Sequence, residues 1–134
     1  YFNANTMISQ RKHKQTSREQ GQWAEELAHN HLCEQGLQSI ERNYRCKMGE
    51  IDLILLEHDI VVFVEVRYRR SQYYGGSLES IDIRKQQRIW NTATYYLQTH
   101  RWAQQHPCRF DVVLISGAVE NPQLHWIVDA FRIN

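Results

Sequence analysis

Two short runs of the chain, residues 51–56 and 60–66, are hydrophobic at nearly every position. Hydrophobic runs of this length are typical of β-strands that are buried on both faces. The polar residues between them, with His58 and Asp59 at the centre, predict a tight turn. The pattern therefore predicts a β-hairpin in a sheet that is covered on both sides.

The register of this hairpin decides which side chains face each other. With the turn centred on positions 58–59, Asp52 lies opposite Glu65 and Glu50 lies opposite Arg67. Directly opposite residues share a face, with Cβ atoms about 5 Å apart. Three carboxylates and a guanidinium are therefore expected to converge, whereas a slip of one residue would separate them.

Helical periodicity predicts two helices, one from the capping-box candidate Thr16-x-x-Glu19 to about Gln35 and one from Asp82 to His100. Further strands are expected at 37–46, 110–115 and, at a sheet edge, 124–128. The second helix is expected to bury a stripe formed by Gln86, Ile89, Trp90, Ala93, Tyr96 and Leu97.

This order of elements predicts an α/β domain of three layers, a mixed β-sheet flanked by helices, over residues 16–134. Residues 1–15 are expected to form a flexible basic arm, of which residues 1–6, before Met7, are interpreted as an expression remnant.

Composition narrows the class of protein. A chain of 134 residues, 42% hydrophobic, is large enough for one domain with its own core. The net charge of +1 means that a nucleic-acid surface must be a local patch. No hydrophobic run approaches the ~20 residues of a membrane helix, so no membrane partner is expected. A reducing, cytoplasmic location is expected because the cysteines are odd in number and lack a Cys-x-x-Cys pair: Cys33, Cys46 and Cys108.

The converging carboxylates suggest a metal site. Two carboxylates this close repel each other unless one is protonated, paired with a cation or bridged by a metal ion. Oxygen ligands at this spacing suit Mg²⁺ or Mn²⁺. The competing interpretation is structural, with Arg67 neutralising Glu50 and Asp52 at the end of the sheet.

The same region carries a resemblance to a known family. From about Gly21 onward the chain resembles the YraN family of uncharacterised proteins, within the PD-(D/E)xK nuclease superfamily and distantly similar to archaeal Holliday-junction resolvases. Arg67 stands where the superfamily has lysine. The matching residues are Gly21, Ala24-Glu25, Gly36, Asn43, Arg45, Gly49-Glu50-Ile51-Asp52-Leu53-Ile54, Phe63-Val64-Glu65-Val66-Arg67, Gly75-Gly76, Lys85 and Arg109-Phe110-Asp111-Val112-Val113.

The resemblance implies a restriction-endonuclease-like fold and a metal-dependent endonuclease that hydrolyses phosphodiester bonds, with branched or flapped DNA as a candidate substrate. Asp52, Glu65 and the backbone carbonyl of Val66 would hold Mg²⁺ or Mn²⁺. Arg67 stays protonated and would stabilise charge, so that the candidate base is either a carboxylate such as Glu50 or metal-bound hydroxide.

Two more catalytic candidates come from the helices. The resemblance implies that Glu25 acts as an outer metal ligand or holds a water molecule, although a boundary carboxylate on an amphipathic helix is also common. Lys85, at the start of the second helix, is a candidate for the ammonium group that Arg67 replaces. Lysine at such a position is otherwise usually solvated.

Basic and aromatic residues interleave in segment 67–76, directly after the hairpin. Guanidinium groups bind phosphates and tyrosine rings stack on unpaired bases, although an ordinary exposed loop is the alternative. DNA is favoured over RNA as the partner, and a homodimer is left open. The predicted nucleic-acid contacts are Arg45, Arg69, Arg70, Tyr73, Tyr74, Arg84, Lys85 and Arg88.

A second hypothesis is a non-catalytic nucleic-acid-binding module that retains the nuclease fold. Arg67 in the lysine position supports it, whereas the presence of Glu25, Asp52 and Glu65 together argues against it. A small RNA-processing nuclease is a third, weaker option.

Overall fold

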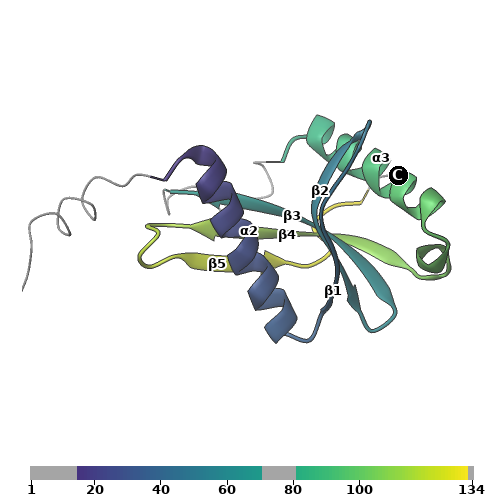
Figure 1. Cartoon of the computed structure of the whole chain (residues 1–134), viewed down its shortest axis with the longest axis horizontal. Helices are drawn as coiled ribbons and strands as arrows, with labels where there is room; N and C mark the ends of the chain where they lie inside the picture. Colours follow the sequence, from purple (N-terminus) through teal and green to yellow (C-terminus); the bar gives the residue numbers. More distant parts are fainter. Residues whose placement is uncertain (1–14, 71–80, 133–134) are drawn as a thin grey trace, which may run out of the picture.

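The computed structural model describes residues 15–70 and 81–132 (Figure 1). Nearly all of the predicted basic arm, and both Tyr73 and Tyr74, lie outside this part of the chain. The predicted order of helices and strands is confirmed, with a short 3₁₀ helix added after the second helix. The elements are α2 (Ser17–Glu34), β1 (Gln38–Cys46), β2 (Gly49–Glu57), β3 (Ile60–Arg69), α3 (Ile83–Thr99), η2 (Arg101–Gln105), β4 (Cys108–Ser116) and β5 (Gln123–Ile127).

The five strands form one mixed sheet in the order β1-β2-β3-β4-β5. Strands β3 and β4 are parallel, and the other neighbours are antiparallel. Figure 1 shows α2 crossing in front of β3, β4 and β5, while α3 lies beside β2. The three-layer α/β architecture predicted from the sequence is thus confirmed, and it is consistent with a restriction-endonuclease-like fold.

Each helix covers its own hydrophobic core. One core joins Ala24, Ala28 and Leu32 of α2 to Val62 and Val64 of β3. The other core joins α3 to the opposite face of the sheet. Burial of each large hydrophobic side chain in such a core stabilises the fold by roughly 1.5–3 kcal/mol. The two cores explain why β2 and β3 are hydrophobic on both faces.

The β2–β3 hairpin has the register that the sequence predicts. Its ladder runs from Glu57 paired with Ile60 to Leu53 paired with Val64, so the turn consists of two residues, His58 and Asp59. His58 has a φ of 54°, in the left-handed region that a turn this tight requires. The register directs Asp52 and Glu65 toward the same end of the pair of strands.

Side-chain caps fix where both helices begin. Thr16 and Glu19 form the predicted capping box at the start of α2. Asp82 caps α3 by accepting a hydrogen bond from the backbone N–H of Lys85 at 2.8 Å. These caps set the positions of the candidate residues Glu25 and Lys85 along their helices.

The predicted core stripe of α3 is wrong at one position. Trp90 is 36% exposed, whereas Thr92, which lies outside the predicted stripe, is fully buried. A Cβ atom added to Gly49 would lie only 3.0 Å from Thr92 Oγ1. Helix α3 therefore approaches the start of β2 closely at Thr92, and this leaves little room for a larger side chain at either position. Trp90 instead packs at the margin of the sheet, 5.9 Å from the Phe110 ring.

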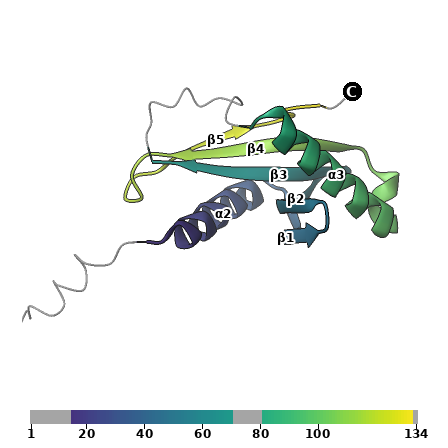
Figure 2. The same cartoon turned by 90° about the horizontal axis from the view of Figure 1, so that it is seen from above.

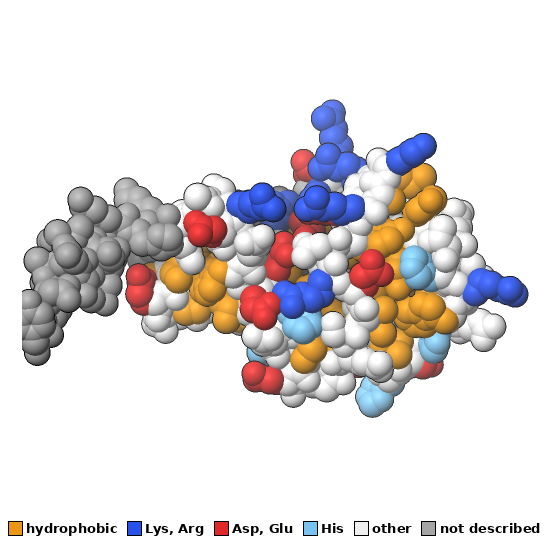
Figure 3. Space-filling model, in the orientation of Figure 1, with side chains coloured by type: hydrophobic (Ala, Val, Ile, Leu, Met, Phe, Trp, Pro, Cys, Tyr) orange, Lys and Arg blue, Asp and Glu red, His pale blue; other side chains and the backbone are white. Residues whose placement is uncertain are grey.

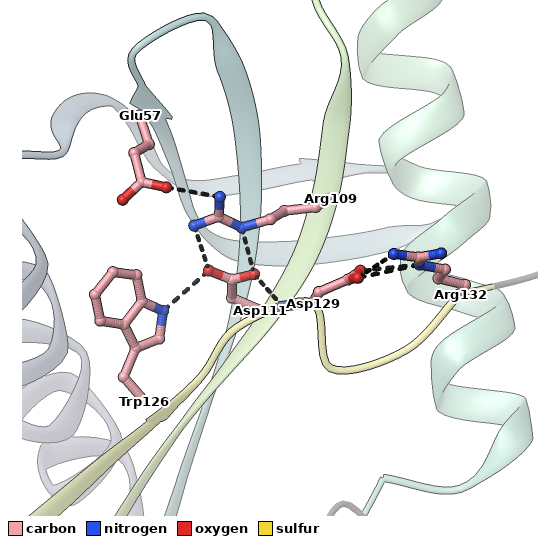
Figure 4. Close-up of polar contacts among 6 residues, drawn as sticks. All are labelled: Glu57, Arg109, Asp111, Trp126, Asp129 and Arg132. Atoms are coloured by element: carbon pink, nitrogen blue, oxygen red, sulfur yellow. Dashed lines mark hydrogen bonds and ion pairs between the residues drawn. The ribbon is translucent and has the colours of Figure 1, made fainter.

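A buried ion pair ties β4 to the hairpin and to the C-terminal segment (Figure 4). Arg109 binds both oxygens of the Asp111 carboxylate at 2.9 and 3.1 Å and also binds Glu57 at 2.7 Å. Asp111 further accepts hydrogen bonds from the Trp126 indole and the Asp129 backbone N–H, each at 2.9 Å. A buried carboxylate with four donors is fully satisfied, which is typical of a structural role.

Within residues 15–70 and 81–132, no helix is both long enough and hydrophobic enough to cross a membrane.

Candidate functional site

Asp52 and Glu65 lie on neighbouring strands where the β2–β3 ladder ends. Beyond Leu53, the backbone N–H of Val66 donates to Asp52 Oδ2 at 2.8 Å. Asp52 is 7% exposed and Glu65 is 6% exposed, and the two carboxyl groups lie close enough to shift each other's pKa. The structure therefore brings together the pair that the hairpin register predicted.

Burial disfavours the charged forms of both carboxyl groups. Burial raises the pKa of Glu65 to about 8, and repulsion from the Asp52 carboxylate is the second cause. Burial also raises the pKa of Asp52, against the hydrogen bond from the Val66 N–H. Because the two carboxyl groups influence each other, the pair as a whole retains a proton to higher pH than two separate carboxyl groups would.

Two cations approach the same oxygen of Glu65. Arg67 Nε, from β3, and Lys85 Nζ, from the first turn of α3, each lie 3.5 Å from Glu65 Oε2. Lys85 was proposed from the sequence as a source of an ammonium group, and the structure brings its side chain to the carboxylate pair. Arg67, which the structural interpretation assigned to Glu50 and Asp52, lies against Glu65.

Glu50, on β2, forms an ion pair with Arg45 on the neighbouring strand β1. Arg45 Nε lies 2.8 Å from Glu50 Oε2, and the two residues are register partners in the β1–β2 ladder. This partner was missed because the sequence pattern predicts a register for the second hairpin but none for the first. Arg45 keeps 74% of its side chain exposed.

Glu25 joins the carboxylates from the opposite layer of the fold. Burial raises its pKa, and the negative charges of Asp52 and Glu50 raise it further. The nearby side chain of Asn43 acts in the other direction and lowers the pKa of Glu25. The structure thus brings Glu25 within electrostatic reach of the cluster, as the resemblance implied, and adds Asn43, for which the sequence predicted no role.

The predicted nucleic-acid residues fall into three groups. Arg45, Arg70, Arg84 and Arg88 are exposed, and Arg69 is half-buried. Lys85 belongs to the carboxylate cluster, and Tyr73 and Tyr74 lie outside the described residues. Figure 3 shows Lys and Arg side chains gathered along the upper edge of the molecule, with acidic side chains below them. This edge is where β2 and the start of α3 lie in Figure 1.

The chemistry of the cluster fits a hard divalent cation. Its buried donors are carboxylate oxygens, which suit Mg²⁺ and Mn²⁺, and the raised pKa values of Asp52 and Glu65 show that burial disfavours two charged carboxylates there. Within residues 15–70 and 81–132, no three His, Cys, Asp or Glu side chains are grouped closely enough to hold a metal ion by themselves. The predicted ligand set needs only two such side chains, Asp52 and Glu65, with the carbonyl of Val66.

Comparison with known proteins identifies relatives over most of the chain. The family model described as "Uncharacterised protein family UPF0102" matches residues 24–115, which include Glu25, Asp52, Glu65 and Lys85. A UPF0102 protein of Stutzerimonas stutzeri (strain A1501) is 53% identical over 117 residues, covering 87% of this chain and 97% of that protein. A UPF0102 protein of Pseudomonas aeruginosa (strain LESB58) is 50% identical, covering 88% of this chain and 96% of that protein. A UPF0102 protein of Nitrosococcus oceani is 45% identical, covering 88% of this chain and 95% of that protein.

Proposed function

The chain belongs to the uncharacterised protein family UPF0102, within the PD-(D/E)xK-like nuclease superfamily, and we propose that it is a metal-dependent nuclease that hydrolyses phosphodiester bonds. The observation that carries this proposal is the pair of nearly buried carboxylates, Asp52 and Glu65, flanked by Arg67 and Lys85. Buried titratable residues with strongly shifted pKa values are concentrated at functional sites.

Asp52, Glu65 and the backbone carbonyl of Val66 would hold the metal ion. Bound Mg²⁺ or Mn²⁺ supplies a Lewis acid that polarises a phosphate oxygen and acidifies water. The protein contributes preorganised ligands, because Asp52 is already fixed by the hydrogen bond from the Val66 N–H.

Arg67 and Lys85 would stabilise the negative charge that develops on the phosphate. Arginine cannot give up its proton under these conditions and therefore acts only through charge and hydrogen bonds. Lys85 offers the compact ammonium group that the superfamily carries in the position of Arg67. The equal 3.5 Å distances of the two cations from Glu65 Oε2 support a shared role.

A carboxylate outside the metal-holding pair would accept the proton from the attacking water. Glu25 is one candidate, because a raised pKa brings a carboxylate closer to the range that suits proton transfer at neutral pH. Glu50, which forms an ion pair with Arg45, is the other. The reaction needs one of these groups in its ionised form.

Nucleic acid is the proposed substrate, with DNA favoured over RNA and branched or flapped DNA as the first candidates. Exposed arginines surround the cluster on two sides, from β1 and from the first turns of α3. Guanidinium groups bind phosphate oxygens as planar forks and hold the backbone in register without reading its sequence.

A cleavage assay tests this proposal directly. Linear, flapped, forked and four-way DNA and matched RNA are incubated with the protein and Mg²⁺, Mn²⁺ or EDTA. We expect cleavage of at least one shape with metal, none with EDTA, and a loss of at least about 10²-fold in rate for Asp52→Asn, because the amide keeps the shape but removes a ligand charge. Asp59→Asn, an exposed turn carboxylate, is the matched control and should cleave like the parent.

The second candidate is a nucleic-acid-binding module without catalysis, favoured by Arg67 in the lysine position. It predicts salt-dependent binding of nucleic acid but no cleavage of any shape with either metal. Binding by both the parent and Asp52→Asn, with no cleavage by either, would replace the nuclease proposal with this one.

A further inference from the structure

Asn43 has an uncommon backbone conformation for its place in a strand. It lies within the edge strand β1 and has a φ of 54°, in the left-handed region. Few residues other than glycine adopt this region, and asparagine is among those that do so at the lowest cost. Such a residue inside a strand needs a reason, because it interrupts the regular alternation of side chains.

The strand changes face at Asn43. Residues two apart in a regular strand point to the same face, yet Arg42 pairs with Glu26 on α2 while Tyr44 packs against Tyr96 on α3, with ring centroids 5.0 Å apart. The two neighbours of Asn43 therefore contact helices that cover opposite faces of the sheet. The left-handed backbone of Asn43 lies at the point of this change.

The partner strand changes face at the same level. Arg42 pairs with Leu53 and Tyr44 pairs with Ile51, which sets Asn43 opposite Asp52. Ile51 packs in the core with α3, whereas Leu53 packs in the core with α2. Figure 2 shows the consequence, because β1 and β2 bend away from the line of β3, β4 and β5, on the side where α2 lies.

The side chain of Asn43 completes the arrangement. It lies close enough to the carboxyl group of Glu25 on α2 to lower the pKa of that group, and because a carboxylate only accepts, the NH₂ of the Asn43 amide is the group that faces it. Glu25 is held in this way despite the negative charges of Asp52 and Glu50 nearby. One residue thus contributes both the bend and a donor to the carboxylate that the bend brings close.

We propose that Asn43 is a positioning residue, whose left-handed backbone and side-chain amide together hold the Glu25 carboxylate beside Asp52 and Glu50. This inference rests on the proposed function, because the cluster is the proposed metal site. It adds a residue that acts through Glu25 and touches neither the metal nor the substrate.

Two substitutions separate the backbone from the amide. Asn43→Gly removes the amide but keeps a residue that adopts a positive φ freely, so its unfolding temperature should stay within about 3 °C of the parent. Asn43→Ala removes both features and should lower the unfolding temperature by about 5 °C. His58→Gly is the matched control, because His58 has the same φ of 54° and is also exposed, but lies in the β2–β3 turn.

Mn²⁺ affinity is the first measurement. Loss of a group that orients a site carboxylate typically weakens metal binding about 10-fold or more, which we expect for Asn43→Gly but not for His58→Gly. In a Glu25→Gln background, Asn43→Gly should cause no further loss, because its effect runs through Glu25. Full additivity of the two losses, or an Asn43→Gly protein that binds Mn²⁺ like the parent, overturns the proposal.

A measurement without metal separates this inference from the proposed function. The side-chain NH₂ signals of Asn43 are recorded by NMR in EDTA for the parent and for Glu25→Gln. We expect these signals to shift when the charged acceptor is removed. Unchanged signals overturn the role of Asn43 even if the metal site is real, whereas shifted signals in a protein that binds no Mn²⁺ keep the Asn43 contact and overturn the metal-dependent function.

Discussion

At the scale of single residues, the metal-free protein stores unfavourable electrostatic free energy in the Asp52–Glu65 pair. Both side chains are nearly buried and both pKa values are raised, that of Glu65 to about 8. A group whose pKa is raised from 4.5 to about 8 on folding binds more protons in the folded state than in the unfolded state between these values. The free energy of unfolding therefore decreases as pH rises from about 4.5 to about 8.

Glu65→Gln should remove this pH dependence, because the amide keeps the shape of the side chain but does not titrate. In EDTA we expect the variant to be more stable than the parent by about 2 kcal/mol at pH 9 and by much less at pH 5. Urea unfolding at pH 5, 7 and 9 measures this, with Glu34→Gln on the exposed face of α2 as control. A stability difference that is the same at all three pH values would show that Glu65 ionises normally.

The two cations near Glu65 lead to a second prediction at this scale. We expect Arg67→Ala and Lys85→Ala each to lower the cleavage rate about 10²-fold, because each removes a charge that stabilises the transition state. Arg67→Lys should keep or raise the rate, since lysine supplies the ammonium group that the superfamily has there.

Mn²⁺ affinity and unfolding temperature are measured for the same three variants. A loss of rate that follows a loss of stability would point to damage to the fold. If Lys85→Ala abolishes cleavage while Arg67→Ala does not, Lys85 alone performs the role that we divide between them.

At the scale of secondary-structure elements, the β2–β3 hairpin shows what the sequence allows. Its hydrophobic run on each side and its two-residue turn leave one register that buries both runs, and the structure has that register. The amino-acid sequence alone is therefore enough to pair Asp52 with Glu65. The N-terminal capping box was equally readable, because its two residue types and their spacing define it.

The remainder of the site depends on contacts that no local pattern encodes. The pairing of Arg45 with Glu50 requires the register of β1, and the position of Glu25 requires the bend at Asn43. The helical periodicity of α3 also could not exclude Trp90 from the core. Periodicity identifies the hydrophobic face of a helix, but it does not show how closely that helix approaches the sheet. Asparagine in a strand was the only available sign of the bend.

At the scale of the whole molecule, charge is arranged locally and not globally. The net charge is only +1, so attraction of nucleic acid depends on where the basic side chains lie. Arg84 and Arg88 are exposed on the first turns of α3, on the helix that delivers Lys85 to the carboxylates. A backbone held by these arginines would run past the proposed metal site.

Replacing Arg84 and Arg88 together by alanine should therefore weaken binding of DNA in EDTA. The slope of log K against log salt concentration should fall by about one unit for each phosphate that the variant no longer neutralises, hence by about two. Arg101→Ala is the control, because Arg101 is also exposed but lies beyond the far end of α3, in η2. Fluorescence anisotropy over a series of salt concentrations gives both affinity and slope. Equal effects from Arg101→Ala would mean that DNA is bound without preference for this edge, and an unchanged slope in the double variant would place the phosphate-binding side chains elsewhere on the molecule.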